Sequence, residues 1–125
     1  MKPHGMPRRW RLAERAAIRA VFAKGRAYRF GVLHAKALAS GRTETRYSIS
    51  VRRAVGTAPE RNRIKRLVRE GVRLEPPRLP VAHDICFFVP AAPAKPPTLA
   101  DIQRDLRQLA RRINDSFQFR VPSSG

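Results

Sequence analysis

Residues 61–69 combine side chains that can bind a phosphate backbone. A guanidinium group makes flat, forked contacts with phosphate that an ammonium group cannot make, and an amide can hydrogen-bond a base edge. On a helical wheel with about 100° between successive residues, this stretch continues into two outward rows. We call these two rows the basic plate: Arg61, Lys65 and Arg69 in one row, and Asn62, Arg66 and Arg73 in the other.

The basic plate is unfavourable for an isolated helix. Like charges four residues apart destabilise a helix by about 0.2–0.5 kcal/mol per pair. Glu70 can neutralise Arg66 or Arg73, but no acidic residue at helical spacing offsets the row that begins at Arg61. A solvated face on a basic protein could carry the same row. Because the chain has few acids, the pattern favours an RNA or DNA backbone as the partner.

The composition of the whole chain has the same bias. It has 125 residues, with 27 Lys and Arg against 9 Asp and Glu, and a formal net charge of +18. Such a charge opposes compaction and attracts polyanions, so we expect nucleic acid as the partner, with a membrane surface as the lesser candidate. The length suits one domain, and an apolar fraction of 42% is enough for a core.

The single cysteine and the apolar runs indicate the compartment. Cys86 alone cannot form an internal disulfide framework or a Cys-rich zinc site, and its place in "DICFFV" predicts a small buried hydrophobe. No apolar run approaches the roughly 18 residues of a membrane span. The start "MKPHGMPRRWR" lacks the apolar segment of a secretory signal. We therefore expect a soluble, cytoplasmic protein.

Side chains that could support catalysis by the protein itself are few. Asp101 and Asp105 lie one turn apart, where they are expected to favour the start of a helix and to pair with Arg104 or Arg107.

The histidines are no better placed for catalysis. His4 falls in the N-terminal arm, and His34 is as well explained by a sheet face as by a binding cleft. His83 is next to Asp84, but the nucleophile that a relay would serve is missing, so a strand-edge hydrogen bond is expected there. The protein alone is predicted to be inactive.

The hydrophobic pattern predicts a small α+β domain. "DICFFV" is a continuous apolar run typical of a central strand, and "YSISV" alternates as a half-buried strand, expected to form a hairpin with the strand before it. We expect a helix from Leu12 to Lys24, strands over 32–38 and 47–51, and a helix over 58–74. A strand over 84–89 and a last helix follow, the helix running from Thr98 to a tail that begins at Ser116.

The basic helix has clear signals at both ends. Thr57 and Glu60 have the spacing of a capping box, and Pro59 falls in the first turn, where its missing N–H costs little. The helix should run from Ala58 to Leu74, before two prolines. Its core-facing residues are expected to be Ile64, Leu67, Val68, Gly71 and Val72.

The stretch "ISVRRAVGTAPERNRIKRLVREGVRL", residues 49–74, resembles the protein subunit of bacterial ribonuclease P. The core "RNRIKRLVRE" is similar to the signature helix of that family almost residue for residue. The resemblance extends to "RL" at 11–12, "VFAKG" at 21–25 and "DICFFV", and covers about residues 11–113.

This resemblance implies a fold and a division of the chain. Members of the family have a mixed sheet with helices on it, and a rare left-handed crossover around the basic helix. For this chain it implies an RNA-binding domain over residues 11–115, in line with the single two-layer α+β domain that the pattern predicts. The composition predicts a disordered basic arm over 1–10 and a flexible tail over 116–125.

The resemblance also implies a function. A large RNA subunit with Mg²⁺ hydrolyses the phosphodiester bond that releases the 5′ leader of precursor tRNA, and one monomeric protein assists it. The protein would be a non-catalytic subunit of this endoribonuclease, and Mg²⁺ would be held mainly by the RNA. Residues implied to contact the catalytic RNA are Arg61, Asn62, Arg63, Lys65, Arg66 and Arg69. Residues implied to line the leader cleft are Phe22, His34, Ser50, Arg52 and Arg53.

Several positions depart from the family pattern. Ile18 and His34 stand where an aromatic residue is frequent, and Ala54 stands where the family usually has a cation. Pro59 replaces an aliphatic residue, and "PAAP" lacks an Arg that often follows the central strand. The aromatic changes reduce base stacking, which is worth about 1–3 kcal/mol per base.

Two other functions fit a basic helix. A ribosomal-type protein would bind RNA structurally with no part in cleavage. A DNA-binding regulator would place the helix in a major groove, but such proteins usually dimerise and carry short polar residues at the helix start. Pro59 and Glu60 occupy that start here, and no dimerisation stripe is evident.

Overall fold

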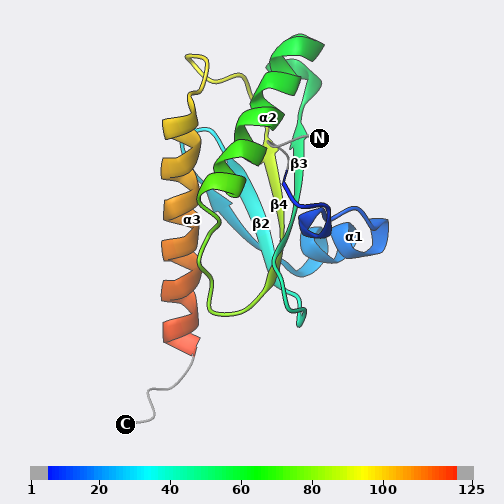
Figure 1. The fold of residues 1–125 in the computed structure, drawn as a ribbon, viewed down its shortest axis with the longest axis vertical. Helices are drawn as coiled ribbons and strands as arrows, with labels where there is room; N and C mark the ends of the chain where they lie inside the picture. Colours follow the sequence, from blue (N-terminus) through cyan, green and yellow to red (C-terminus); the bar gives the residue numbers. More distant parts are fainter. Residues whose placement is uncertain (1–5, 121–125) are drawn as a thin grey trace.

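The structure is a computed structural model that describes residues 6–120, with side chains as far as Phe117. Within these residues, three α-helices and one four-stranded mixed sheet form a small α+β domain, as predicted (Figure 1). The elements, with η for a 3-10 helix, are η1 Arg8–Trp10, α1 Arg15–Lys24, β1 Arg26–Arg29, β2 His34–Ala39, β3 Arg46–Val51, η2 Arg53–Val55, α2 Ala58–Leu74, β4 His83–Val89 and α3 Leu99–Arg120.

The strands lie in the order β1-β2-β4-β3. β2 runs antiparallel to both β1 and β4, whereas β3 runs parallel to β4. β4 is therefore an inner strand, as its continuous apolar sequence predicted. α2 connects the parallel pair β3 and β4, which makes it the crossover helix; the left-handed sense of this crossover stays a prediction.

The predicted pairing of residues 47–51 with the preceding strand is wrong, because β4 lies between β2 and β3. The hairpin partner of β2 is β1, a strand that the sequence did not predict. β1 has the sequence "RAYR", in which only Tyr28 is buried. One inward apolar side chain is too little alternation to indicate a strand.

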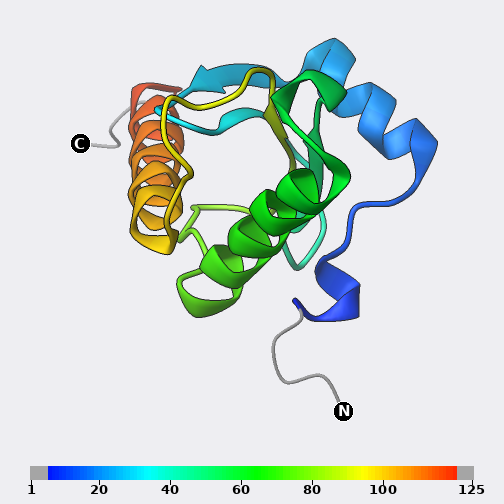
Figure 2. The same ribbon diagram turned by 90° about the horizontal axis from the view of Figure 1, so that it is seen from above.

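Helices cover both faces of the sheet (Figures 1 and 2). On one face, α2 and α3 pack over Ile85, Phe87 and Val89 of β4 to form the main core. On the other face, α1 packs Val21 against Cys86 in a smaller cluster. The sheet and the α2–α3 layer are thus the two predicted layers, and α1 adds a partial layer on the opposite face of the sheet. Cys86 is buried as predicted, and burial raises the pKa of its thiol.

The N-terminal segment packs onto the domain. Of the arm predicted to be disordered, residues 1–5 lie outside the described residues. Residues 6–10 contradict the prediction, since they include η1 and a buried Met6. The Glu44 carboxylate accepts hydrogen bonds from Arg9 Nε at 2.8 Å and from Trp10 Nε1 at 3.1 Å. These contacts hold η1 against the loop between β2 and β3.

The first and last helices differ from their predicted bounds. α1 begins at Arg15 instead of Leu12, because the Leu12 N–H donates to the Tyr47 carbonyl at 2.8 Å and keeps this stretch extended along β3. α3 continues to Arg120, so the predicted tail from residue 116 is helical as far as that residue; residues 121–125 lie outside the described residues. None of the helices in the described part of the chain combines the length and apolar character of a membrane span.

α2 has the bounds that its sequence predicted. The Glu60 N–H donates to Thr57 Oγ1 at 3.3 Å and the Thr57 N–H donates to Glu60 Oε1 at 2.7 Å, which confirms the capping box. Four of the five predicted inward residues are buried: Ile64, Val68, Gly71 and Val72. The fifth, Leu67, is half-buried. The basic plate must therefore lie on the opposite side of the helix.

Candidate nucleic-acid interface

Most of the basic plate is free of acidic partners. Arg73 is the exception, because its guanidinium binds the Glu70 carboxylate at 3.1 and 2.5 Å. None of the ion pairs between described residues includes any of the other four plate cations. Asn62 and Arg66 are exposed, and the remaining plate residues are half-buried. The charge of the plate is thus left for a partner to neutralise.

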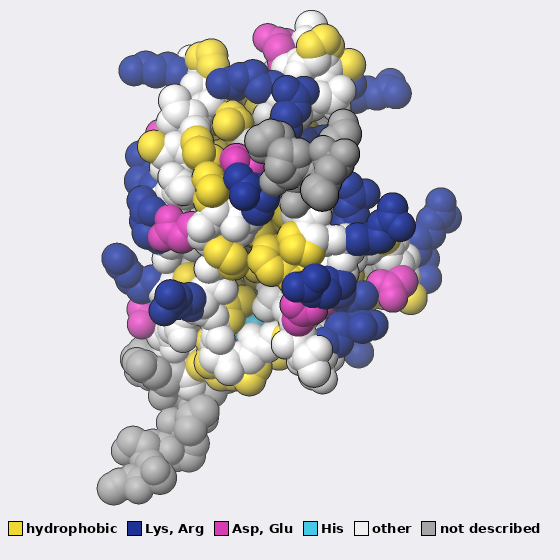
Figure 3. Space-filling model, viewed as in Figure 1, with side chains coloured by type: hydrophobic (Ala, Val, Ile, Leu, Met, Phe, Trp, Pro, Cys, Tyr) yellow, Lys and Arg dark blue, Asp and Glu magenta, His cyan; other side chains and the backbone are white. Residues whose placement is uncertain are grey.

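The plate cations keep most of their hydrogen-bond donors. Arg61 donates one N–H to the Gly56 carbonyl at 3.3 Å, which orients its guanidinium near the helix start. A guanidinium carries five N–H donors, so four remain after this contact. Figure 3 shows Lys and Arg side chains over the face that α2 and α3 form and along its rim.

Arg63 lies apart from the plate. Its guanidinium donates to the Pro97 carbonyl at 3.1 Å, in the loop that precedes α3. This contact directs Arg63 toward the loop 90–98 instead of the outer side of α2. The structure therefore separates Arg63 from the other residues that were predicted to contact catalytic RNA.

Three of the five predicted leader-binding residues lie together on the α1 face of the sheet. His34 and Ser50 flank Phe88 in adjacent strands. The Phe88 ring lies 5.6 Å from the His34 ring and 6.1 Å from the Phe22 ring of α1, centroid to centroid. We call Phe22, His34 and Phe88 the aromatic surface. The Phe22 side chain remains 44% exposed, so a base can reach it.

Phe88 and Lys36 also belong to this surface, although neither was predicted from the sequence. Lys36 Nζ donates to the Phe22 carbonyl at 2.8 Å and lies 5.7 Å from the centre of the Phe22 ring. It therefore ties the end of α1 to β2 and adds a cation beside the ring. The missed signal was alternation within "DICFFV": Cys86 and Phe88 share one face, whereas Phe87 faces the main core.

The two predicted leader arginines follow β3. Arg52 and Arg53 are both exposed. The Arg52 N–H donates to the Val89 carbonyl at 3.2 Å, so the extended backbone continues past Val51. By strand alternation Arg52 lies on the same face as Ser50, whereas Arg53 begins η2.

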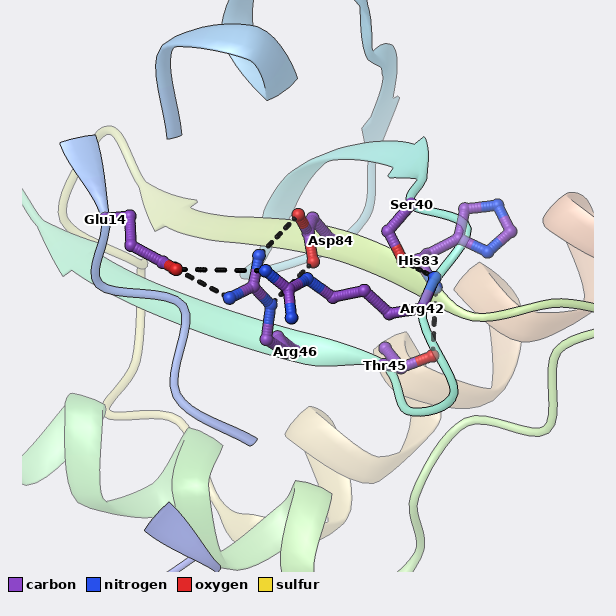
Figure 4. A network of polar contacts seen from close by, with 7 residues as sticks. All are labelled: Glu14, Ser40, Arg42, Thr45, Arg46, His83 and Asp84. Atoms are coloured by element: carbon purple, nitrogen blue, oxygen red, sulfur yellow. Dashed lines mark hydrogen bonds and ion pairs between the residues drawn. The ribbon is translucent and has the colours of Figure 1, made fainter. Parts of the chain in front are cut away.

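An ion-pair network centred on the buried Arg46 and Asp84 lies on the same face, near the start of α1 (Figure 4). Arg46 is 8% exposed and binds both oxygens of Asp84 at 3.0 Å. Its guanidinium also donates to Glu14 at 2.6 Å, and this hydrogen bond is the main cause that lowers the pKa of Glu14. Arg42 lies 3.8 Å from the Glu14 carboxylate. The network joins α1 to β3 and β4.

His83 does not form a relay with Asp84. Its Nδ1 lies 2.9 Å from the Val81 carbonyl, and its backbone N–H donates to Thr45 Oγ1 at 3.1 Å. Burial lowers the pKa of the imidazole. These are hydrogen bonds at the start of a strand, as predicted for His83, while Asp84 is taken up by the ion-pair network.

The two acids of α3 have structural partners. Asp101 and Thr98 form a capping box at the start of α3, with nitrogen-to-oxygen distances of 2.9 and 3.2 Å, and Arg104 lies 3.6 Å from Asp101. Asp105 is buried and accepts the Val32 and Leu33 N–H groups at 2.9 and 3.1 Å, so it holds the turn between β1 and β2.

The predicted partners of Asp105 are only partly present. Arg104 Nε lies 3.9 Å from its second oxygen, whereas Arg107 binds Glu75 at 2.8 Å. Among the described residues, no three His, Cys, Asp or Glu side chains come together in a way that could hold a metal ion. The acidic, histidine and cysteine side chains of the described residues therefore do not fit a metal site formed by the protein alone.

Comparisons with known proteins agree on one family. The family model described as Ribonuclease P matches residues 6–114. A ribonuclease P protein component from an Exiguobacterium species is 32% identical over 107 residues, which cover 86% of this chain and 92% of that protein. The same component from Symbiobacterium thermophilum is 42% identical over 76 residues, which cover 59% of this chain and 65% of that protein.

Solved structures give the same result. The RNase P protein of Staphylococcus aureus is similar with a TM-score of 0.70 and 25% identity, covering 84% of this chain and 97% of that one. The RNase P protein of Thermotoga maritima is similar with a TM-score of 0.70 and 26% identity, covering 82% of this chain and 96% of that one.

Proposed function

The chain belongs to the ribonuclease P protein family, and we propose that it binds the RNA subunit of ribonuclease P through the basic plate. The observation that carries this proposal is the set of four plate cations without an acidic partner in the described chain. Phosphates of a folded RNA would neutralise these cations and release counterions, which supplies most of the binding free energy of such contacts. Arg63 would contact RNA beside the plate.

The aromatic surface would hold the 5′ leader of precursor tRNA. Phe22, His34 and Phe88 offer faces on which single-stranded bases can stack, and Ser50 lies beside them. Arg52 and Arg53 are exposed next to this surface and would contact the leader phosphates. This arrangement supports a leader site on the face opposite the main core.

Hydrolysis would be the work of the RNA subunit, with Mg²⁺ held mainly by that RNA. The protein would lower the magnesium requirement, because cations on the plate reduce phosphate repulsion that divalent ions must otherwise offset. We propose one protein monomer per RNA, acting in the cytoplasm.

A reconstitution tests the proposal. The protein is mixed with a bacterial ribonuclease P RNA and a precursor tRNA that carries a 5′ leader, at a magnesium concentration where the RNA alone cleaves slowly. We expect faster cleavage with the protein and none with the protein alone. If the protein binds the RNA without accelerating cleavage, a structural RNA-binding role replaces the proposed one.

A further inference from the structure

A cleft lies beside the plate, between residues at the start of α2 and the loop before α3; these two segments are at the top of Figure 1. Its volume is about 490 Å³. The cleft has apolar walls and two charged side chains: Val55, Ile64, Ala92, Pro93, Pro96 and Pro97, with Glu60 and Arg63. An apolar cleft with a few convergent polar groups is the usual form of a small-molecule site.

The walls of this cleft are preorganised. Proline fixes its own backbone torsion, and Pro93, Pro96 and Pro97 all contribute to the outer wall. The loop is held at its end, because the Pro97 carbonyl accepts a hydrogen bond from Arg63 and Thr98 begins the capping box of α3. A ligand that enters would therefore pay little to order the loop.

The two charged side chains offer complementary contacts. Glu60 gives one oxygen to the Thr57 N–H, and this hydrogen bond lowers the pKa of the carboxyl, so it is ionised at neutral pH with its second oxygen available. Arg63 gives one N–H to Pro97 and has others available. Residues three apart on a helix lie about 5–6 Å apart at Cβ, close enough to contact one planar ligand together.

Guanine has the matching chemistry. Its O6 and N7 accept hydrogen bonds from a guanidinium, and its amino group on the neighbouring edge donates to a carboxylate. Proteins that read RNA sequence bind bases that are unpaired and can leave the stack. We propose that this cleft receives one unpaired guanine of the RNA that the basic plate binds. The proposal deepens the proposed function and rests on it for the source of the guanine.

Short oligonucleotides test the pocket without the holoenzyme. The full chain is titrated with 5′-UUGUU-3′ and with 5′-UUAUU-3′ while backbone amide signals are followed by NMR. We expect the guanine oligonucleotide to bind roughly tenfold more tightly, in line with the discrimination of a bidentate base contact, and to shift the signals of Val55, Ile64 and Ala92. Equal affinities, or shifts confined to the basic plate, would overturn the proposal.

Two variants separate a base contact from a structural effect. Glu60→Gln keeps an oxygen for the Thr57 N–H but replaces the acceptor that the guanine amino group needs. The preference for guanine should therefore fall severalfold while the fold remains, with the Arg63 contact to O6 and N7 left in place. Ala92→Phe fills the cleft and should weaken binding of ribonuclease P RNA about tenfold. Ala91→Phe is its control, since Ala91 is also exposed and is not among the residues that line the cleft.

The outcomes of these experiments are distinguishable. If wild-type protein fails to bind ribonuclease P RNA or to stimulate cleavage, the proposed function fails. If the wild type succeeds but Ala92→Phe and Ala91→Phe behave alike, or the guanine preference of Glu60→Gln equals that of the wild type, only the guanine pocket fails.

Discussion

Replacing Arg61 and Lys65 by Ala should weaken RNA binding without weakening the fold. Both residues belong to the row of the basic plate that has no acidic partner among the described residues. The like-charge repulsion between them, about 0.2–0.5 kcal/mol, disappears in the variant. Ala also favours a helix more than either residue. The thermal midpoint should therefore stay unchanged or rise slightly.

The loss of affinity can be estimated from counterion release. Each phosphate contact contributes about 0.7–0.9 to the slope of log K against log salt concentration. Two lost contacts should reduce the slope by roughly 1.4–1.8. With equal binding of wild type and variant at 1 M salt as the reference, the variant should bind about 15–30-fold more weakly than the wild type at 0.15 M salt. In free energy this is about 2 kcal/mol.

The assay is filter binding of ribonuclease P RNA at several salt concentrations, with circular dichroism to monitor folding. A matched control removes two cations from α3 instead, by Arg107→Ala and Arg111→Ala. Arg107 already binds Glu75 at 2.8 Å, and both residues are exposed. If the control loses as much salt dependence as the plate variant, total charge and not the plate decides binding. Unfolding of the plate variant would show that the outward placement of these side chains is wrong.

Three further predictions concern residues outside the plate. Phe22→Ala and Phe88→Ala should each weaken precursor tRNA binding by about 1–3 kcal/mol and leave mature tRNA binding unchanged; an equal loss for both tRNAs would exclude leader stacking. Asp84→Ala should destabilise the domain by about 3–5 kcal/mol in urea unfolding, because it leaves the buried Arg46 without its bidentate partner; a loss under 1 kcal/mol would contradict this. Because burial lowers the pKa of His83, the folded state resists its protonation, so stability should fall as the pH drops below about 6.5; His83→Gln should remove this part of the pH dependence in urea unfolding.

Local signals predicted the basic helix α2 well. A capping box, a proline in the first turn and two prolines after the end all lie within or beside α2, and the helix has the predicted bounds. Its outward face followed from periodicity alone, since the inward residues are apolar. The plate could therefore be identified before any tertiary contact was known.

Non-local pairing was not accessible in the same way. Arg46 and Asp84 are 38 residues apart, and nothing in either neighbourhood indicates that they meet. Their contact depends on β4 lying beside β3, which in turn depends on the α2 crossover. The same insertion of β4 explains why the hairpin was predicted wrongly, and why Phe88 was missed between His34 and Ser50.

β4 explains how one small domain can offer the two proposed RNA-binding surfaces without competition between them. Its alternate side chains face opposite sides: Phe87 enters the core beneath α2 and α3, whereas Phe88 joins the aromatic surface beside α1. The plate therefore lies on the outer side of a helix packed on one face of the sheet, and the proposed leader site lies directly on the strands of the other face. A rigid RNA would bind the plate while a flexible single strand follows the sheet, because neither would have to displace the other. The ion pair between Arg46 and Glu14 fixes α1, so the position of Phe22 depends on the same sheet that supports α2.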